Sequence, residues 1–113
     1  MQRIFKVFRA DEWAYFKASG STSGSPDDIR DGFIHFSTGA QLRGTVEKHF
    51  AGEEGLWLVV CDVAQLGEDL RWEESRGGAL FPHLYRRIHM RDVSSSEELK
   101  RRGGRYFFEE DVR

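Results

Sequence analysis

The sequence predicts a single α+β domain. Segments rich in β-branched and aromatic residues lie between segments of helical periodicity, without the regular strand–helix–strand alternation of a parallel sheet. The chain has 113 residues, of which 39% are hydrophobic and 32% charged. This length and composition suit one globular core and are too small for two. We therefore treat residues 1–113 as one domain.

The start of the chain predicts a strand followed by a short helix. β-favouring residues at positions 4–8 indicate the strand. Residues 11–19 indicate the helix, with Trp13 and Phe16 on its buried side and Gly20 placed to end it.

A loop and a second strand come next. The loop at residues 21–31 is rich in glycine, serine and aspartate, and within it Ser25 and Pro26 resemble the cap and first turn of a very short helix. Residues 33–36 are aromatic or apolar around one histidine and predict the second strand.

A longer helix is predicted directly after this strand. Thr38 and Gln41 match a capping box, which marks a helix start, and the helix is expected to run to about Phe50. Leu42 and Val46 fall on one arc of that helix at 100° per residue, so they should form its buried side.

The second half of the chain predicts mainly strands. Residues 56–61 are apolar without alternation, as in a central strand that is buried on both faces. Residues 70–73 predict a fourth, shorter strand, and residues 84–90 predict another.

The C-terminal part, residues 94–113, leaves two alternatives open. Residues 93–102 fit either a helix capped by a serine or a strand that turns at Gly103 and Gly104 into residues 106–108. A glycine pair between two such runs favours the hairpin.

Composition excludes several classes of function. A net charge of −2 provides no global basic field for nucleic acid or for an anionic membrane. The apolar stretch at 56–61 is far too short to span a bilayer. No long apolar region follows the N-terminus, so we expect no secretory signal and a cytoplasmic location. Cys61, the single cysteine, excludes an internal disulfide and is interpreted as a small buried hydrophobic residue.

One basic and aromatic segment, residues 100–108, has the composition of a nucleic-acid-binding strand. From residue 97 to residue 113, however, five acidic residues balance five basic ones. We therefore expect a solvated terminus and no nucleic-acid partner. The sequence does not indicate an oligomeric state, and a monomer is the default.

Two short islands, residues 32–38 and 76–85, combine polar, aromatic and glycine residues more densely than the rest of the chain. In the first island, His35 alternates with Ser37 on one face of the predicted strand. His35 is interpreted as ligand-contacting, against the alternative of a half-buried histidine bonded to a neighbour. Thr38 is a candidate ligand contact as well, although the capping box already explains it.

The second island contains His83 after a proline, which we interpret as a histidine held by a rigid turn, with Tyr85 one alternation later. Between residues 71 and 91, five arginines outnumber two glutamates, which favours a phosphate or carboxylate ligand. Arg76, beside two glycines, is the best anion-binding candidate. Arg86 and Arg87 are interpreted as solvated side chains of an edge strand.

Other known motifs are missing. The glycine pair in the second island lacks the context of a P-loop or of a dinucleotide fingerprint, and the chain has no zinc helix. His35, His83 and Glu73 are residue types that bind metals, but their spacing does not require a metal. We therefore predict no metal site.

Both islands, in this order, resemble the bacterial family known as domain of unknown function 952. The matching features are Glu12 with Trp13, the segment at 32–38, and Trp72 with Glu73 followed by residues 81–85. The resemblance runs from about residue 4 to residue 93. That family is grouped by fold with the ADP-ribosyltransferases, which implies a split, strongly bent sheet with two main helices and a cleft for NAD.

The resemblance also implies roles for individual residues. Lys6 would stand near the first-strand position where many such enzymes carry histidine or arginine, His35 would lie on the second cleft strand, and His83 near the position of the catalytic glutamate. The chain departs from the pattern, because it has no Glu-x-Glu motif.

We therefore hypothesise a cleft that binds NAD, ADP-ribose or another nucleotide-like anion, with NAD as substrate rather than as a resident cofactor. The ligand-binding residues would be Lys6, Ser37, Thr38, Arg76, Phe81 and Tyr85. In an enzyme that transfers an ADP-ribosyl or phosphate group, His35 would orient the ribose. His83 would act as acid, base or electrostatic stabiliser, and Glu73 would be the reserve base. The alternative is a non-catalytic module that binds a protein or metabolite.

Overall fold

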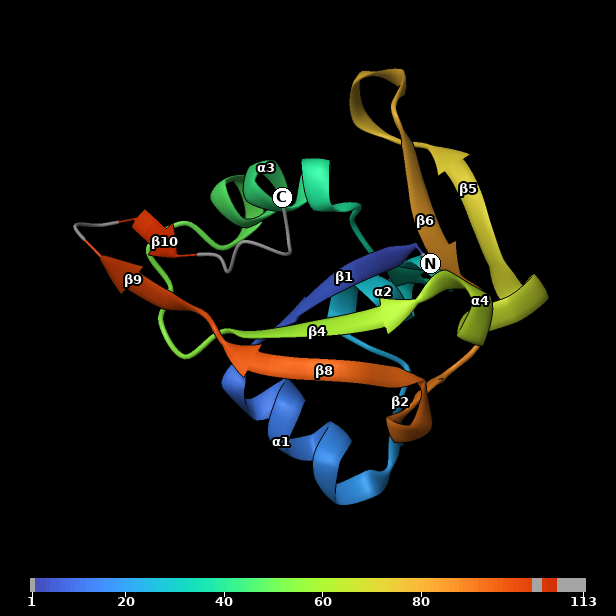
Figure 1. Cartoon of the computed structure of the whole chain (residues 1–113), viewed down its shortest axis with the longest axis horizontal. Coiled ribbons are helices and arrows are strands. Elements are labelled where there is room, and N and C mark those ends of the chain that lie inside the picture. The colour runs from blue at the N-terminus through green and yellow to red at the C-terminus, as the bar shows by residue number, and fades with distance from the viewer. Residues whose placement is uncertain (1, 103–104, 108–113) are drawn as a thin grey trace.

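A computed structural model describes residues 2–102 and 105–107 of the chain. Its central sheet is antiparallel and contains β1 (Arg3–Phe8), β4 (Trp57–Asp62) and β8 (Val93–Glu98), with β4 in the middle (Figure 1). The predicted central strand at 56–61 is thus confirmed, and Cys61 is buried within it. Burial raises the pKa of the Cys61 thiol to about 12.

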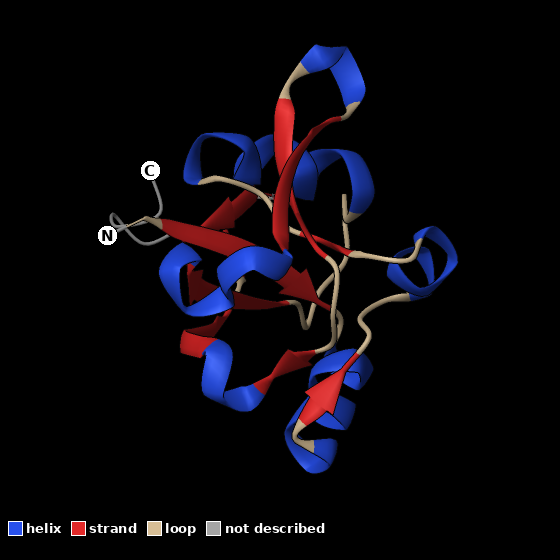
Figure 2. Ribbon diagram, turned by 90° about the vertical axis from the view of Figure 1, so that its right-hand side faces the viewer, coloured by secondary structure: helices blue, strands red, loops and turns tan. Residues whose placement is uncertain are grey.

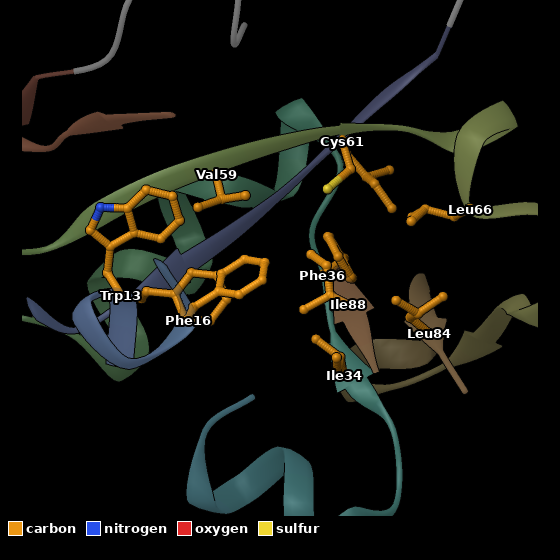
Figure 3. Packing of buried hydrophobic residues seen from close by; sticks show 11 residues of the cluster. Trp13, Phe16, Ile34, Phe36, Val59, Cys61, Leu66, Leu84 and Ile88 are labelled. Carbon is orange, nitrogen blue, oxygen red and sulfur yellow. The ribbon is translucent and has the colours of Figure 1, made fainter. Parts of the chain in front are cut away.

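Two helices cover the two faces of this sheet. Residues of α1 (Ala10–Ser19) pack with Ile4 and Phe8 of β1, whereas residues of α3 (Gly39–His49) pack with Phe5 and Val7 of the same strand. Successive side chains of a strand point to opposite faces, so β1 has a helix on each side. Figure 3 shows the α1 side, where Trp13 and Phe16 lie beside Val59, as their predicted burial requires.

A second antiparallel sheet contains β3 (Ile34–His35), β6 (Leu80–Leu84) and β5 (Leu70–Glu74), with β6 in the middle. The hairpin of β5 and β6 projects away from the central sheet (Figures 1 and 2). The short strand predicted at 70–73 is therefore confirmed as β5.

The strand predicted at 84–90 is wrong in its extent. Leu84 ends β6, and the chain then turns before a two-residue strand, β7 (Ile88–His89), which pairs with β2 (Ser21–Thr22). Sequence reasoning assigned residues 21 and 22 to a loop, because two residues are too few to show any periodicity.

Pro82 lies inside β6, although proline is uncommon within sheets. It is tolerated because the adjacent strand is ending. The N–H of Phe36 donates to the carbonyl oxygen of Pro82 at 3.0 Å, and proline has no N–H to return the second bond. The next residue, Ser37, instead exchanges two hydrogen bonds of 2.8 Å with Phe5 of β1. The interpretation of His83 as part of a turn is therefore wrong.

The remaining elements are short. The very short helix predicted after Ser25 is present as α2, and residues 93–98 form a strand rather than the alternative helix. Lys100–Arg102 pairs with Arg105–Phe107, as the predicted hairpin requires, while the glycine turn itself lies outside the described residues. The short elements are α2 (Pro26–Asp31), α4 (Val63–Leu66), the 3-10 turns η1 (Gly67–Asp69), η2 (Arg76–Gly78) and η3 (Met90–Asp92), β9 (Lys100–Arg102) and β10 (Arg105–Phe107).

Strands and helices thus form one compact α+β domain with several antiparallel sheets. Within the described part of the chain, no helix has both the length and the apolar character needed to cross a membrane.

Candidate functional site

A cavity of about 290 Å³ opens between β1, α2, β3, α3 and β6. The segment at 34–37 connects two walls of the cavity. His35 of β3 pairs with His83 of β6, and the backbone of Ser37 is hydrogen-bonded to β1. Opposed residues of an antiparallel pair point to the same face of the sheet, so both imidazoles lie on one side. The lining residues on which the following argument depends are Lys6, Asp28, His35, Ser37, Phe81 and His83.

Asp28 is the centre of the most buried polar network on this cavity. Its side chain is 1% exposed and lies on α2, where Ser25 caps the helix. One carboxylate oxygen, Oδ2, is 2.7 Å from Nζ of Lys6 and accepts the backbone N–H of Ser25. The other, Oδ1, is 2.6 Å from Nδ1 of His35 and accepts the backbone N–H of the same histidine.

These contacts decide the charge of Asp28. Burial alone would raise the pKa of the carboxyl group, but the hydrogen bond from His35 and the charge of Lys6 outweigh it and lower the pKa to about 2. Asp28 is therefore a carboxylate throughout the physiological range, and it neutralises a lysine that is itself almost fully buried.

His35 is held by carboxylates at both ring nitrogens. Besides the bond of Nδ1 to Asp28, its Nε2 lies 3.1 Å from Oδ2 of Asp31, at the end of α2. Both ring nitrogens of His35 are thus engaged by carboxylates of the α2 segment, and both of these carboxylates also line the cavity.

His83 has a different set of partners. Its Nδ1 is 2.8 Å from Oε1 of Glu73 on the neighbouring strand β5, and the hydroxyl group of Tyr85 donates to the same oxygen at 2.7 Å. The hydrogen bonds from Tyr85 and then His83 lower the pKa of Glu73, and the bond to Glu73 raises the pKa of Tyr85. The pairing of β5 with β6 puts Glu73 on the same face of the sheet as His83.

Phe33 packs against both histidines from the loop before β3. Its ring stacks on His83 with the centroids 4.1 Å apart, and it is tilted against His35 at 4.6 Å and Tyr85 at 5.2 Å. The two imidazole rings are 5.5 Å apart and meet nearly edge to face. An aromatic side chain thus fixes the planes of both histidines.

The charged side chains around the cavity largely pair with one another. Three cations and three carboxylates line it, if the histidines are left aside. Arg9 makes two hydrogen bonds to Glu53, of 2.9 and 3.0 Å, and Arg30 pairs with both Asp27 and Asp31. The cavity is therefore polar but not strongly basic.

The nine residues predicted for the site fall into four groups. Five of them line the cavity, namely Lys6, His35, Ser37, Phe81 and His83. Glu73 and Tyr85 lie behind His83, while Thr38 caps α3 by accepting the N–H of Gln41. The side chain of Arg76 lies outside the described part of the structure, although its neighbour Ser75 lines the cavity.

The arginines that suggested an anion site are mostly engaged elsewhere. Arg86 forms an ion pair with Asp92 at 2.9 Å rather than solvating an edge strand. Arg87 donates to Ser21 and Ser23, and the guanidinium group of Arg71 lies over the ring of Tyr85. The local excess of positive charge is thus used largely for internal contacts.

Asp28 is the residue that sequence reasoning missed. Its position three residues after Ser25 was interpreted only as part of a helix start, and a carboxylate in a first turn is normally solvated. The available signal was the match of Ser25 and Asp28 to a capping box, which the structure confirms. Nothing local indicates that the same carboxylate also reaches Lys6 and His35.

Comparison with known proteins agrees with this geometry at the level of the fold. The chain is similar to protein CC0527 from Caulobacter crescentus, at 40% sequence identity to its crystal structure, with a TM-score of 0.91 and 97% of each chain covered. The solution NMR structure of that protein matches at 42% identity with a TM-score of 0.83, over 94% of this chain and 91% of the other. A search of curated proteins finds no significant match.

A family model matches residues 7–96, close to the extent expected from the two islands. The matched segment contains every residue that lines the cavity except Phe5 and Lys6, which directly precede it. The chain belongs to the family described as protein of unknown function, DUF952.

Proposed function

We propose that the cavity binds the ribose-containing part of a nucleotide-like anion such as NAD or ADP-ribose. The observation that carries this proposal is the meeting of His35, Ser37 and His83 on one cavity with the aromatic wall of Phe81. The imidazole of His83 and the hydroxyl group of Ser37 suit the hydroxyls of a sugar, and the aromatic wall of Phe81 suits a planar ring.

The size of the cavity limits what it holds. Pockets for drug-sized ligands have volumes of about 300–1,000 Å³, and this one has about 290 Å³. It therefore suits a nucleoside-sized part of the ligand, with the phosphates outside. Because Ser75 lines the cavity, the following residue, Arg76, is the proposed phosphate contact.

The resemblance to the fold group of the ADP-ribosyltransferases supports this choice of ligand. The group is expected to have a split sheet, and here two three-stranded sheets share the residues at 34–37. Chemistry at the ribose of NAD, either hydrolysis or transfer to an acceptor, is the corresponding activity.

A non-catalytic binding module is the second candidate. The internal pairing of cations favours it, because Lys6 is already neutralised by Asp28 and Arg9 by Glu53. Such a cavity would select a neutral or zwitterionic metabolite over a polyphosphate.

Calorimetric titration with NAD, ADP-ribose, AMP and nicotinamide riboside tests the proposal. We expect saturable binding of NAD or ADP-ribose, weakened about tenfold or more in Phe81→Ala through loss of stacking. Trp72→Ala is the matched control, because Trp72 lies on the opposite face of the same hairpin and is exposed. Failure of all four compounds to bind at millimolar concentration would favour the second candidate.

A further inference from the structure

The two histidines of the cavity have unequal surroundings. Both nitrogens of His35 contact carboxylates, from Asp28 and Asp31. His83 contacts a carboxylate only through Nδ1, and its Nε2 has no hydrogen-bond partner among the residues that the structure describes. His83 nevertheless lines the cavity, although its side chain is only 6% exposed.

We propose that His83 is the proton acceptor of this site, with the lone pair of Nε2 presented to the cavity, and that Glu73 and Tyr85 are its positioning residues. His35 has a different role and braces the α2 segment. The inference deepens the proposed function, on which it rests for the identity of the ligand.

The protons of this cluster can be assigned by elimination. A carboxylate only accepts hydrogen bonds, so the hydroxyl group of Tyr85 and Nδ1 of His83 both donate to Oε1 of Glu73. A neutral imidazole carries one proton, and here it is on Nδ1. Nε2 is then unprotonated, which is the state that a general base requires. The lowered pKa of Glu73 agrees with this assignment.

The ring is also prevented from turning over. Phe33 stacks on one face of His83 at 4.1 Å with an interplanar angle of 25°, and the backbone of His83 lies in the middle strand of its sheet. A ring flip would put Cδ2 in the place of Nδ1 and Cε1 in the place of Nε2, and would break the bond to Glu73. The hydroxyl group of Tyr85 donates to the same oxygen of Glu73 and limits the rotamers of that carboxylate, and Arg71 packs over the Tyr85 ring. The geometry is therefore preorganised for one direction of proton transfer.

Hydrolysis of NAD shows how such a base would act. The oxygen of a water molecule forms a bond to C1′ of the ribose, while the bond from C1′ to the nicotinamide nitrogen breaks. The electron pair of the broken bond remains on nicotinamide, which leaves as a neutral molecule. Nε2 of His83 takes the proton that the water molecule loses, and the imidazolium that results is stabilised by Glu73. A hydroxyl group of an acceptor can replace the water molecule without changing this balance.

Nitrogen-15 NMR of the histidine rings tests the assignment without a ligand. In wild type, over pH 5–9, the neutral form of His83 should show a protonated Nδ1 and an unprotonated Nε2. In Glu73→Ala the population should shift toward the tautomer protonated at Nε2, while Tyr85→Phe should shift it less. Glu74→Ala is the matched control, because Glu74 is adjacent, exposed and on the other face of β5. A predominantly Nε2-protonated His83 in wild type, or an unchanged tautomer ratio in Glu73→Ala, would overturn the inference.

A second measurement separates this inference from the proposed function. If NAD or ADP-ribose binds, the Nε2 signal of His83 should move on saturation more than either ring signal of His35. Any turnover of NAD should fall by about 10²–10⁴ in His83→Ala and change its pH profile in Glu73→Ala. Binding that leaves the His83 signals in place contradicts the inference alone. Absence of binding contradicts the proposed function alone, and the tautomer of the free protein still decides the inference.

Discussion

Nζ of Lys6 lies 2.7 Å from Oδ2 of Asp28, and the two side chains are 7% and 1% exposed. The pair joins β1 to α2, which are separated by the whole of α1 in the sequence. Removing two charges from water is costly, and the attraction between them compensates only when both remain in place. Loss of either side chain would therefore leave the charge of the other buried and unpaired.

Replacement of Asp28 by asparagine should destabilise the protein severely. The substitution keeps the size of the side chain but leaves the Lys6 charge buried without a partner, at an expected loss of about 3–5 kcal/mol in the free energy of unfolding. Urea denaturation at pH 7 measures it. The double variant Lys6→Met with Asp28→Asn should recover a large part of the loss. A single Asp28→Asn variant as stable as wild type would show that the pair contributes nothing.

The same pair predicts how stability depends on acid. The pKa of Asp28 is about 2 in the folded protein against 3.8 for the ordinary group. Because the folded value is the lower one, the stabilisation is complete above pH 4 and is lost as the pH falls from about 4 to about 2. The amount is about 2 kcal/mol. It should be visible as a difference between the acid-unfolding curves of wild type and Asp28→Asn. Asp27→Asn, which changes an exposed carboxylate of the same helix, should leave the wild-type curve nearly unchanged.

Substitution of Gly24 by alanine should destabilise the protein far more than the same substitution at other glycines with positive φ. Its φ is +95°, and a Cβ atom there would meet the carboxylate of Asp28, with Cγ at only 2.8 Å. Gly32 has a φ of +84° and open space around it, so Gly32→Ala isolates the backbone strain of roughly 1–2 kcal/mol. Gly24→Ala should cost at least about 2 kcal/mol more, because it also displaces Asp28 from Lys6. Equal losses in thermal or urea denaturation would contradict the clash.

Thr38→Ala distinguishes a capping residue from a ligand contact. Thr38 and Gln41 exchange the two hydrogen bonds of a capping box at the start of α3. Loss of the hydroxyl group should reduce stability by about 1 kcal/mol and leave the affinity for NAD or ADP-ribose unchanged. Ser37→Ala, by contrast, should weaken binding, because Ser37 lines the cavity. A loss of affinity in Thr38→Ala without loss of stability would return Thr38 to the ligand site.

Local signals account for what could be predicted from the sequence. The apolar run of β4, the capping box at Thr38 and the left-handed Gly20 at the end of α1 each depend on neighbours within one element, and all three are present as expected. A cleft shared by the two islands was a hypothesis from composition, since polar residues among aromatics and glycines are typical of a cavity wall. The pairing of His35 with His83 brings the two islands together.

What could not be predicted depends on contacts between distant segments. Pro82 is acceptable in a strand only because β3 ends opposite it, and this is a property of the partner strand. Asp28 has a local role in the capping box with Ser25, and this role alone explains its place in the sequence. Its contacts with Lys6 and His35 depend on the fold and have no local signal. The functions of the cavity residues remain predictions that the experiments above test.

The backbone of residues 34–37 is bonded to β6 through Phe36 and to β1 through Ser37. The segment at 34–37 thus fixes β6 and β1, two walls of the cavity, relative to each other. The positions of His35 and His83 are therefore established when the chain folds rather than when a ligand binds. A molecule that enters loses its own translational and rotational freedom but demands little ordering of the main chain around it. Association should therefore proceed nearly as between rigid bodies, with little main-chain movement between the free and bound states.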